Sequence, residues 1–214
     1  MHEELINIYN ENMEMVGYAP KKEAHRQGLW HKSIHCWLFT VLEGKPCVIM
    51  QKRASCKLLM PDYFDVSVAG HYEKDEVKND GFREVMEEFG ISVAAEAWHY
   101  LGVKFDVGIS ENAVNKEFCE VFFAEVDNPM TDFYMDPKEV DAVVWIPVDD
   151  GLRLFSGACE SLTVSGIGRT ADGQVAKQTF TVDQNRFIPR TDPYYAKIFA
   201  IADLYFRGYE HLYI

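Results

Sequence analysis

Three glutamates, Glu84, Glu87 and Glu88, have the spacing that brings three carboxylates to one face of a helix. Like charges at i, i+3 and i+4 repel one another and weaken a helix when nothing compensates them. Arg83 can pair with Glu87, but one cation cannot neutralise three anions. Hard divalent cations take oxygen ligands, so a metal site is one interpretation of the pattern. The alternative is a solvated acidic face on an ordinary amphipathic helix.

The segment around these glutamates favours the metal site. Apolar residues at i, i+3, i+4 and i+7 predict a helix over 80–89 whose opposite face packs on a core; they are Phe82, Val85, Met86 and Phe89. A predicted strand end over 68–76 precedes the helix and turns through Gly70 into a further acidic run. The helix ends at Gly90, and the apolar Ile91 follows it.

These residues together resemble the Nudix box, G-x5-E-x7-R-E-U-x-E-E-x-G-U, in which U is a bulky apolar residue. The second half of the box matches at every defined position: Arg83, Glu84, Val85, Glu87, Glu88, Gly90 and Ile91. The resemblance implies that the three glutamates ligate Mg²⁺ or Mn²⁺ and that Arg83 orients them and balances their charge. It also implies a further metal ligand in the backbone carbonyl of Ala69.

The first half of the box is one residue out of step. Gly70 and Glu76 have the separation of the family, but Glu76 precedes Arg83 by seven residues instead of eight. We expect the missing residue in the loop over 78–81, where shortening costs less than inside a helix. Counting back from Arg83 instead places Ala69 and Asp75 at the two positions. The sequence therefore leaves open whether Glu76 or Glu73 takes part.

Segments outside the box resemble the Nudix branch that contains isopentenyl diphosphate isomerase. They are 28–37, 51–53 and 64–71, and the resemblance covers roughly residues 5–150. The catalytic cysteine of those isomerases is replaced by Ala69, which has no acid proton to give. Their metal ligands are partly retained: His25, His31 and His71 lie at or near matching positions, Glu117 matches one strand carboxylate, and Asn115 replaces the other.

Other candidates have weaker signals. Glu117 or Glu120 is a candidate further ligand or water-activating base, with a surface carboxylate as the alternative. Lys52 and Arg53 end a predicted strand and are candidate phosphate contacts, and Gly70 would lie against the substrate. Aromatic side chains that could stack on a base or pack an isoprenoid chain are Trp30, Trp37 and Tyr63, although large aromatics are usually core residues.

The resemblance implies a Nudix α/β/α sandwich, in which a mixed sheet lies between the box helix and a closing helix. We expect one domain over 1–214, with an N-terminal strand and loop (1–32), a core (33–150), an inserted β-hairpin (160–185) and a C-terminal helix (192–208). Strands are predicted at 33–42, 47–53, 63–68, 98–107, 117–126 and 140–146, with a strand and turn at 5–15 and a loop at 20–31. Asp172-Gly173 suits the hairpin turn, and Asp192 with Pro193 suits the start of the last helix.

The composition of the chain narrows the classes of molecule that we expect it to bind. A formal net charge of -13 and a pI near 4.9 argue against a nucleic-acid polymer or an anionic membrane. Five scattered cysteines without a C-x-x-C pair predict reduced thiols in a cytoplasmic protein. The amino-terminal residues show no signal peptide, and no long apolar run predicts a membrane span. We expect a small-molecule phosphate substrate, and a homodimer is compatible with the sequence.

The predicted function is metal-dependent hydrolysis of a diphosphate linked to another group, nucleoside or other. The alternatives are an isomerase related to isopentenyl diphosphate isomerase and an inactive Nudix module that binds a ligand. The sequence identifies neither the attached group nor the general base, because Nudix substrate choice lies in loops outside the box.

Overall fold

The computed structural model describes residues 4–57, 59–109 and 114–214, and these fold around one mixed sheet of eleven strands. The strands are β1 (Leu5–Tyr9), β2 (Met15–Pro20), β3 (Trp30–Leu42), β4 (Lys45–Arg53), β5 (Phe64–Asp65), β6 (Val68–His71), β7 (His99–Ile109), β8 (Val114–Glu125), β9 (Val140–Pro147), β10 (Ser161–Arg169) and β11 (Val175–Asp183). The α-helices are α1 (Lys21–Gln27), α2 (Arg83–Phe89), α3 (Val148–Phe155) and α4 (Tyr194–Phe206). Short 3₁₀ turns lie at Asp80–Phe82, Ala95–Ala97, Met130–Asp132 and Gln184–Arg186.

The long strand β3 organises the sheet. It pairs in parallel with β8, whereas the other pairings are antiparallel. Its other edge pairs with β4 over Leu38 to Leu42 and with β6 over Ser33 to Cys36. Because β3 and β4 diverge, the chain over 64–71 fills the fork between them, and β5 pairs with β4. The Ser67 hydroxyl bridges the fork, accepting from the Leu38 amide at 2.9 Å and donating to the Ile49 carbonyl.

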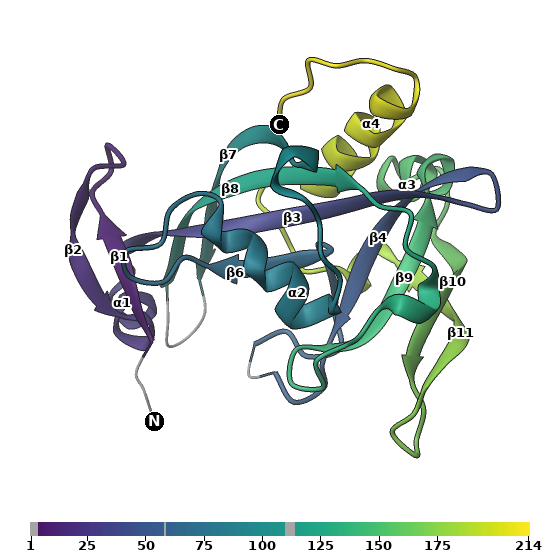
Figure 1. Ribbon diagram of the computed structural model, residues 1–214, viewed down its shortest axis with the longest axis horizontal. Helices are drawn as coiled ribbons and strands as arrows, with labels where there is room; N and C mark the ends of the chain where they lie inside the picture. The colour runs from purple at the N-terminus through teal and green to yellow at the C-terminus, as the bar shows by residue number, and fades with distance from the viewer. Residues whose placement is uncertain (1–3, 58, 110–113) are drawn as a thin grey trace.

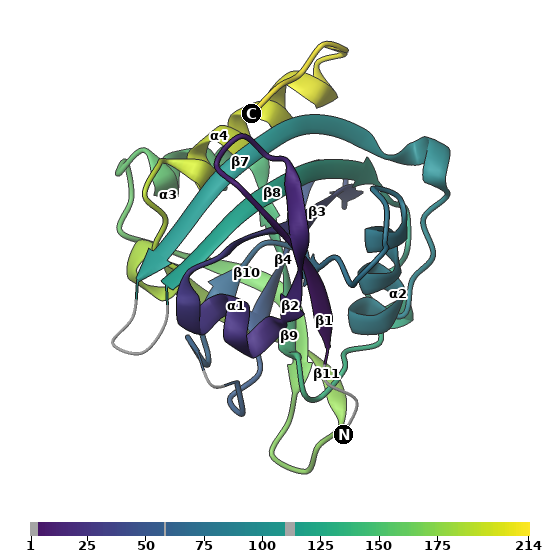
Figure 2. The same cartoon turned by 90° about the vertical axis from the view of Figure 1, so that its left-hand side faces the viewer.

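Alternation along β3 creates two cores, one on each face of the sheet. Trp37 and Phe39 point toward α3 and α4, where they pack with Phe199. Cys36 and Leu38 point toward α2 and pack with its buried Phe89. Figure 1 shows α2 on one side of β3 and α4 on the other, and Figure 2 shows the same separation from the end of the molecule. The expected sandwich with a mixed central sheet is confirmed.

Several local predictions are corrected by the structure. The loop expected at 20–31 contains α1, whose seven residues lack an apolar stripe. The predicted strand over 63–68 is two strands, because its residues change partners at the fork. Helix α3 was not expected, and α4 begins after Pro193 without a side-chain cap, since the Asp192 carboxylate pairs with Lys197 at 2.8 Å.

The expected hairpin is present as β10 and β11, and its turn contains Gly173 at φ 83°. It does not stand apart from the core, because β10 pairs with β9 and extends the main sheet. The hairpin forms one end of the molecule and β1 with β2 forms the other (Figure 1). Within the described ranges, no helix combines the length and apolar character needed to cross a membrane.

Candidate active site

The box helix buries the expected stripe with one exception. Val85 and Phe89 are buried, but Met86 is 49% exposed, so its expected place in the core is wrong. Glu88 is buried instead, at 6% exposure. The first turn of the predicted helix is a 3₁₀ turn, and regular α-helix starts only at Arg83. A carboxylate thus lies inside the protein where the pattern predicted a solvent-facing row.

Arg83 lies at the centre of the box. Its Nε and Nη2 donate to the two carboxylate oxygens of Glu76 at 2.7 and 3.1 Å, a bidentate pair. Its Nη1 donates to Glu84 at 2.8 Å and to Glu87 at 3.1 Å. Burial is the largest single influence on Glu76 and would raise its pKa, but the hydrogen bond from Arg83, the backbone hydrogen bond at Glu73 and the charge of Arg83 together lower it. Glu76 therefore pairs with Arg83 although the box is one residue short.

Gly70 is the glycine that this geometry requires. A Cβ at position 70 would lie 2.2 Å from the carboxyl carbon of Glu84 and 2.3 Å from its Oε1. Any side chain there would push the glutamate out of its place. The alternative alignment gave the glycine position to Ala69 and the glutamate position to Asp75. No such contact supports it, since Asp75 is exposed at a positive φ of 68°.

Two of the box carboxylates are buried beside one another. The Glu84 side chain is 14% exposed, and burial, with Glu87 nearby, raises its pKa to about 7 despite Arg83. Burial, followed by the charges of Glu84 and Glu139, raises the pKa of Glu88 well above its ordinary range. Gln51 Nε2 donates to Glu88 at 3.1 Å, which fixes the carboxylate without neutralising it. A cluster of hard oxygen donors short of positive charge fits a divalent cation.

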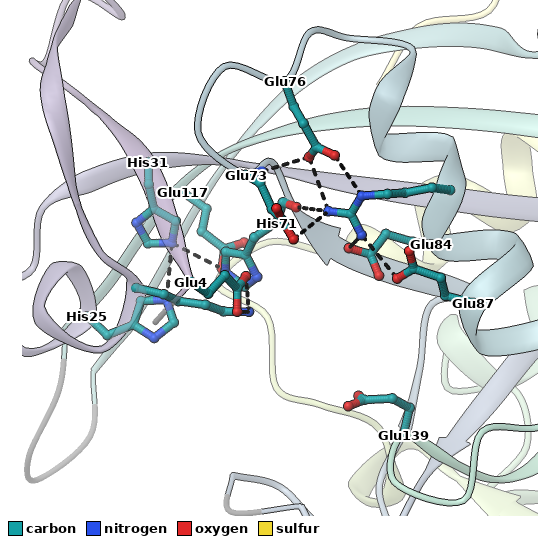
Figure 3. A network of polar contacts seen from close by, with 12 residues as sticks. Glu4, His25, His31, His71, Glu73, Glu76, Glu84, Glu87, Glu117 and Glu139 are labelled. Carbon is teal, nitrogen blue, oxygen red and sulfur yellow. Dashed lines mark hydrogen bonds and ion pairs between the residues drawn. The ribbon is translucent and has the colours of Figure 1, made fainter. Parts of the chain in front are cut away.

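Glu139 is a site residue that the sequence did not reveal. It precedes β9, and its charge, after burial and the charge of Glu84, raises the pKa of Glu88; Figure 3 draws it below Glu84 and Glu87. Its carboxylate pairs with Lys57. The segments that carry this pair are joined by the Ala54 amide, which donates to the Glu139 carbonyl at 2.9 Å. Its sequence neighbourhood, with Asp136 and Asp141 close by, contains no pattern that singles it out.

A second donor set joins the three candidate histidines to Glu117. Donor atoms of His25, His31, His71 and Glu117 all lie within 4.8 Å of one another. The Nε2 atoms of His25 and His31 are 3.2 Å apart, and His71 Nε2 is 3.4 Å from Glu117 Oε1. Bonds of about 2 Å from nitrogen and oxygen to a transition metal or zinc would fit inside such a group. The set therefore fits a cation better than the lone-histidine alternative.

The protonation states of this second set agree with that fit. Burial lowers the pKa of all three histidines, which keeps them neutral at pH 7, the form that ligates metals. Burial would raise the pKa of Glu117, but the hydrogen bond and charge of His71, the charge of His31 and the hydrogen bond from Asn115 together lower it well below its ordinary range. Ser33 and Asn115 donate to the two oxygens of Glu117 at 2.7 and 2.6 Å. Asn115 therefore holds a candidate ligand in place.

His71 connects the two sets. Its backbone carbonyl accepts from Arg83 Nη2 at 3.2 Å, while its side chain faces Glu117. Figure 3 shows His25, His31 and Glu117 on one side of His71 and the carboxylates of Glu84 and Glu87 on the other. Because Gly70 and His71 are adjacent in β6, one short strand fixes both groups relative to each other.

Other expected site residues lie elsewhere. Trp37 is fully buried and donates to the Tyr194 hydroxyl at 2.9 Å, so its expected contact with substrate is wrong. Lys52 pairs with Asp62. Arg53 donates to two carbonyls of its own loop. Glu120 accepts from the Tyr72 hydroxyl at 2.9 Å, outside the histidine group. Arg83 contacts the box carboxylates Glu84 and Glu87, and Lys57 pairs with Glu139.

Known proteins resemble this chain over most of its length. The NUDIX domain family model matches residues 29–158. An uncharacterized Nudix hydrolase from Clostridium acetobutylicum is 30% identical over 196 residues, 91% of this chain and 95% of that protein. An isopentenyl-diphosphate Delta-isomerase from Roseobacter denitrificans is 35% identical over 132 residues, 61% of this chain and 71% of that protein.

A solved structure agrees with these sequence matches. A crystal structure of a Deinococcus radiodurans protein covers 72% of this chain and 90% of its own, with a TM-score of 0.56 and 21% identity, which shows a shared fold. The expected Nudix fold, the Nudix-type hydrolase and the resemblance to the isomerase branch are confirmed. The chain belongs to the NUDIX domain family.

Proposed function

We propose that the protein hydrolyses an organic diphosphate with the help of divalent cations held by Glu84, Glu87 and Glu88. The observation that carries the proposal is the contact between Gly70 and Glu84, which places a buried carboxylate of pKa about 7 beside Arg83. Divalent ions held there, Mg²⁺ or Mn²⁺, supply charge stabilisation to a phosphoryl group and make water a better nucleophile at neutral pH.

The side chains of this chain have separable roles in that reaction. Arg83 fixes the directions of Glu84 and Glu87 through its hydrogen bonds and is itself fixed by Glu76. Glu87, at 57% exposure, is the box carboxylate most open to substrate. Lys57 pairs with Glu139, and its charge acts on Glu88, so it provides positive charge near the box that an acidic protein needs to meet a phosphate.

Hydrolysis is a better account of the site than isomerisation. A double-bond shift needs an acid that protonates carbon, and the position of the isomerase cysteine is occupied by Ala69 in β6. All three box glutamates are present as well, on one short helix. An isomerisation in deuterated water would carry label into the product and release no phosphate, and we expect neither label nor isomer.

The test is a comparison of Glu87→Gln with Glu160→Gln, an exposed glutamate between α3 and β10. Both variants and the wild type are assayed with nucleoside di- and triphosphates, sugar nucleotides, dinucleotides, coenzyme A and prenyl diphosphates, in Mg²⁺ and then Mn²⁺. Glu87→Gln should lose most of the metal-dependent turnover while it keeps its circular dichroism, and Glu160→Gln should match the wild type. Equal turnover in both variants would refute the assignment, and tight binding without turnover in the wild type would favour the inactive module.

A further inference from the structure

We propose that Glu139 and Lys57 make the box bind its ligands in order: a divalent cation draws Glu139 away from Lys57, and the released Lys57 then binds a phosphoryl oxygen of the diphosphate. This order of binding rests on the function proposed above, because it concerns the diphosphate at the same site. Glu139 lies in the turn before β9, and Lys57 lies after the turn that follows β4. Their side chains form an ion pair.

Backbone hydrogen bonds fix both turns against the end of the box helix. The Asp136 amide donates to the Glu88 carbonyl at 3.1 Å, and the Glu139 amide donates to the Asp136 carbonyl at 3.0 Å. From the other turn, the Ala54 amide donates to the Glu139 carbonyl at 2.9 Å, and the Lys57 amide donates to the Ala54 carbonyl at 3.1 Å. The main chain of the pair is therefore held beside α2, and a change of partner involves only the two side chains.

The charges of the pair act in opposite directions on one buried carboxylate of the box. Burial, and then the charges of Glu84 and Glu139, raise the pKa of Glu88, whereas the charge of Lys57 lowers it. Glu88 is 6% exposed, and the neutral amide of Gln51 donates to it at 3.1 Å. Both side chains of the pair are thus within electrostatic reach of the place where Glu84 and Glu88 would hold a cation.

A divalent cation at that place changes the partner that Glu139 prefers. Coulomb attraction is proportional to charge, so a carboxylate at equal distance gains more from a doubly charged ion than from an ammonium group. Hard divalent cations also take carboxylate oxygens as ligands. The Glu139 side chain is 37% exposed, so it can turn without opening a packed core. The charge of Lys57, whose side chain is 25% exposed, is then no longer neutralised by Glu139.

The released Lys57 has the properties that a phosphate contact needs. Its ammonium group is a compact charge with three donors on a flexible chain, and lysine binds phosphate groups as a point charge. The chain has a net charge of -13, so a diphosphate needs local positive charge to approach it. Before the cation binds, Glu139 neutralises Lys57 and the box carboxylates repel the diphosphate. The cation therefore has to bind first.

The test measures diphosphate binding without hydrolysis. Methylenediphosphonate, whose carbon bridge cannot be hydrolysed, is titrated by calorimetry in EDTA and then with both solutions saturated with Mn²⁺. In Mn²⁺, Lys57→Ala should weaken binding about 10-fold, because a charged hydrogen bond is lost. In EDTA, Glu139→Gln should strengthen binding about 5-fold, because Lys57 is already released. The double variant Lys57→Ala with Glu139→Gln should lose this gain, which a loss of negative charge alone would preserve.

A second lysine–carboxylate pair in the same loop provides the matched control. Lys52 pairs with Asp62, whose side chain is 48% exposed. Asp62→Asn removes one negative charge, as Glu139→Gln does, and should leave diphosphonate binding unchanged in both conditions. Titration with Mn²⁺ alone tests the first step. Lys57→Ala should bind Mn²⁺ about 2- to 5-fold more tightly than the wild type, because Glu139 no longer has a competing partner.

The outcomes separate this order of binding from the hydrolase assignment. Equal affinity of the wild type and Glu139→Gln in EDTA, or an equal gain in Asp62→Asn, overturns the proposal. Absence of diphosphonate binding in all the proteins overturns it as well. Binding in Mn²⁺ that Lys57→Ala leaves unchanged also overturns it, but leaves the hydrolase assignment intact. Failure of that assignment is seen separately, as turnover that Glu87→Gln does not reduce.

Discussion

Metal binding at the box should be strongly dependent on pH between 6 and 8. Glu84 must lose its proton to act as a ligand, and its pKa is about 7 in the metal-free protein. At pH 6 roughly nine in ten molecules would hold that proton, and at pH 8 roughly one in ten. From Glu84 alone, the apparent affinity should therefore fall about 10-fold as the pH is lowered from 8 to 6. Glu88, whose pKa is also raised by burial, makes the fall steeper.

The stability of the metal-free protein should change with the opposite sign. The native state keeps a proton on Glu84 that the unfolded chain, with its ordinary pKa of 4.5, has already lost. This contribution to the free energy of unfolding is fully present below pH 4.5 and is lost as pH rises through 7. The shift amounts to about 3 kcal/mol at most. Saturating Mn²⁺ should remove the loss, because the ionised carboxylate then has a cationic partner.

Calorimetric titration of Mn²⁺ at several pH values, in buffers of different ionisation enthalpy, measures both the affinity and the protons released. Glu84→Gln is the matched variant, since it keeps the size of the side chain and cannot titrate. Burial lowers the pKa of each of the three histidines, so their protonation contributes less to the slope than that of free imidazoles would. An affinity that is flat from pH 6 to 8, or an equal slope in Glu84→Gln, would refute the reasoning.

Three further predictions concern single positions. Gly70→Ala should keep the fold by circular dichroism but lose most Mn²⁺ affinity by calorimetry, because its Cβ would occupy the place of Glu84. Glu76→Gln should lower kcat at least about 10-fold, because it releases Arg83. Glu73→Gln is the control and should have little effect, since the Glu73 carboxylate is 57% exposed and 3.9 Å from Arg83. Equal kcat values in the two variants would contradict the pairing of Glu76 with Arg83. His31→Ala should reduce bound Mn²⁺ or Zn²⁺, measured by elemental analysis, by one ion per chain, and an unchanged ratio would exclude the histidine group as a metal site.

Local periodicity was enough to predict most of the sheet and the box helix, because each of these elements has its own apolar face. Local periodicity failed where the residue that determines a side chain's environment is distant in the sequence. Glu139 reaches the site only because β9 pairs with β4. In that pairing Met50 lies opposite Val144, a residue far along the chain. Trp37 shows the same limit. The sequence of a strand does not tell whether an aromatic side chain contacts a ligand or packs inside the protein, and Trp37 contacts Tyr194.

Exposure was the harder property to predict on the box helix. Met86 is exposed and Glu88 is buried, which is the reverse of what their side-chain types suggest, and α2 is only seven residues long. A helix this short contributes little stability of its own, so tertiary contacts determine which face is buried. The buried Glu88 is then tolerated because Gln51 holds it and because a cation can neutralise it.

The short box also shows what the family pattern constrains. Glu76 is fixed by its own turn, since its amide donates to the Glu73 carbonyl at 3.2 Å and its Oε2 accepts from the Glu73 amide at 2.7 Å. The chain then reaches Arg83 through the Asp80–Phe82 3₁₀ turn, which rises more per residue than an α-helix and so covers the distance with fewer residues. The Arg83 fork still meets both oxygens of Glu76. What must be conserved is therefore the contact between guanidinium and carboxylate, and the residue count between them can vary as long as the loop restores that contact.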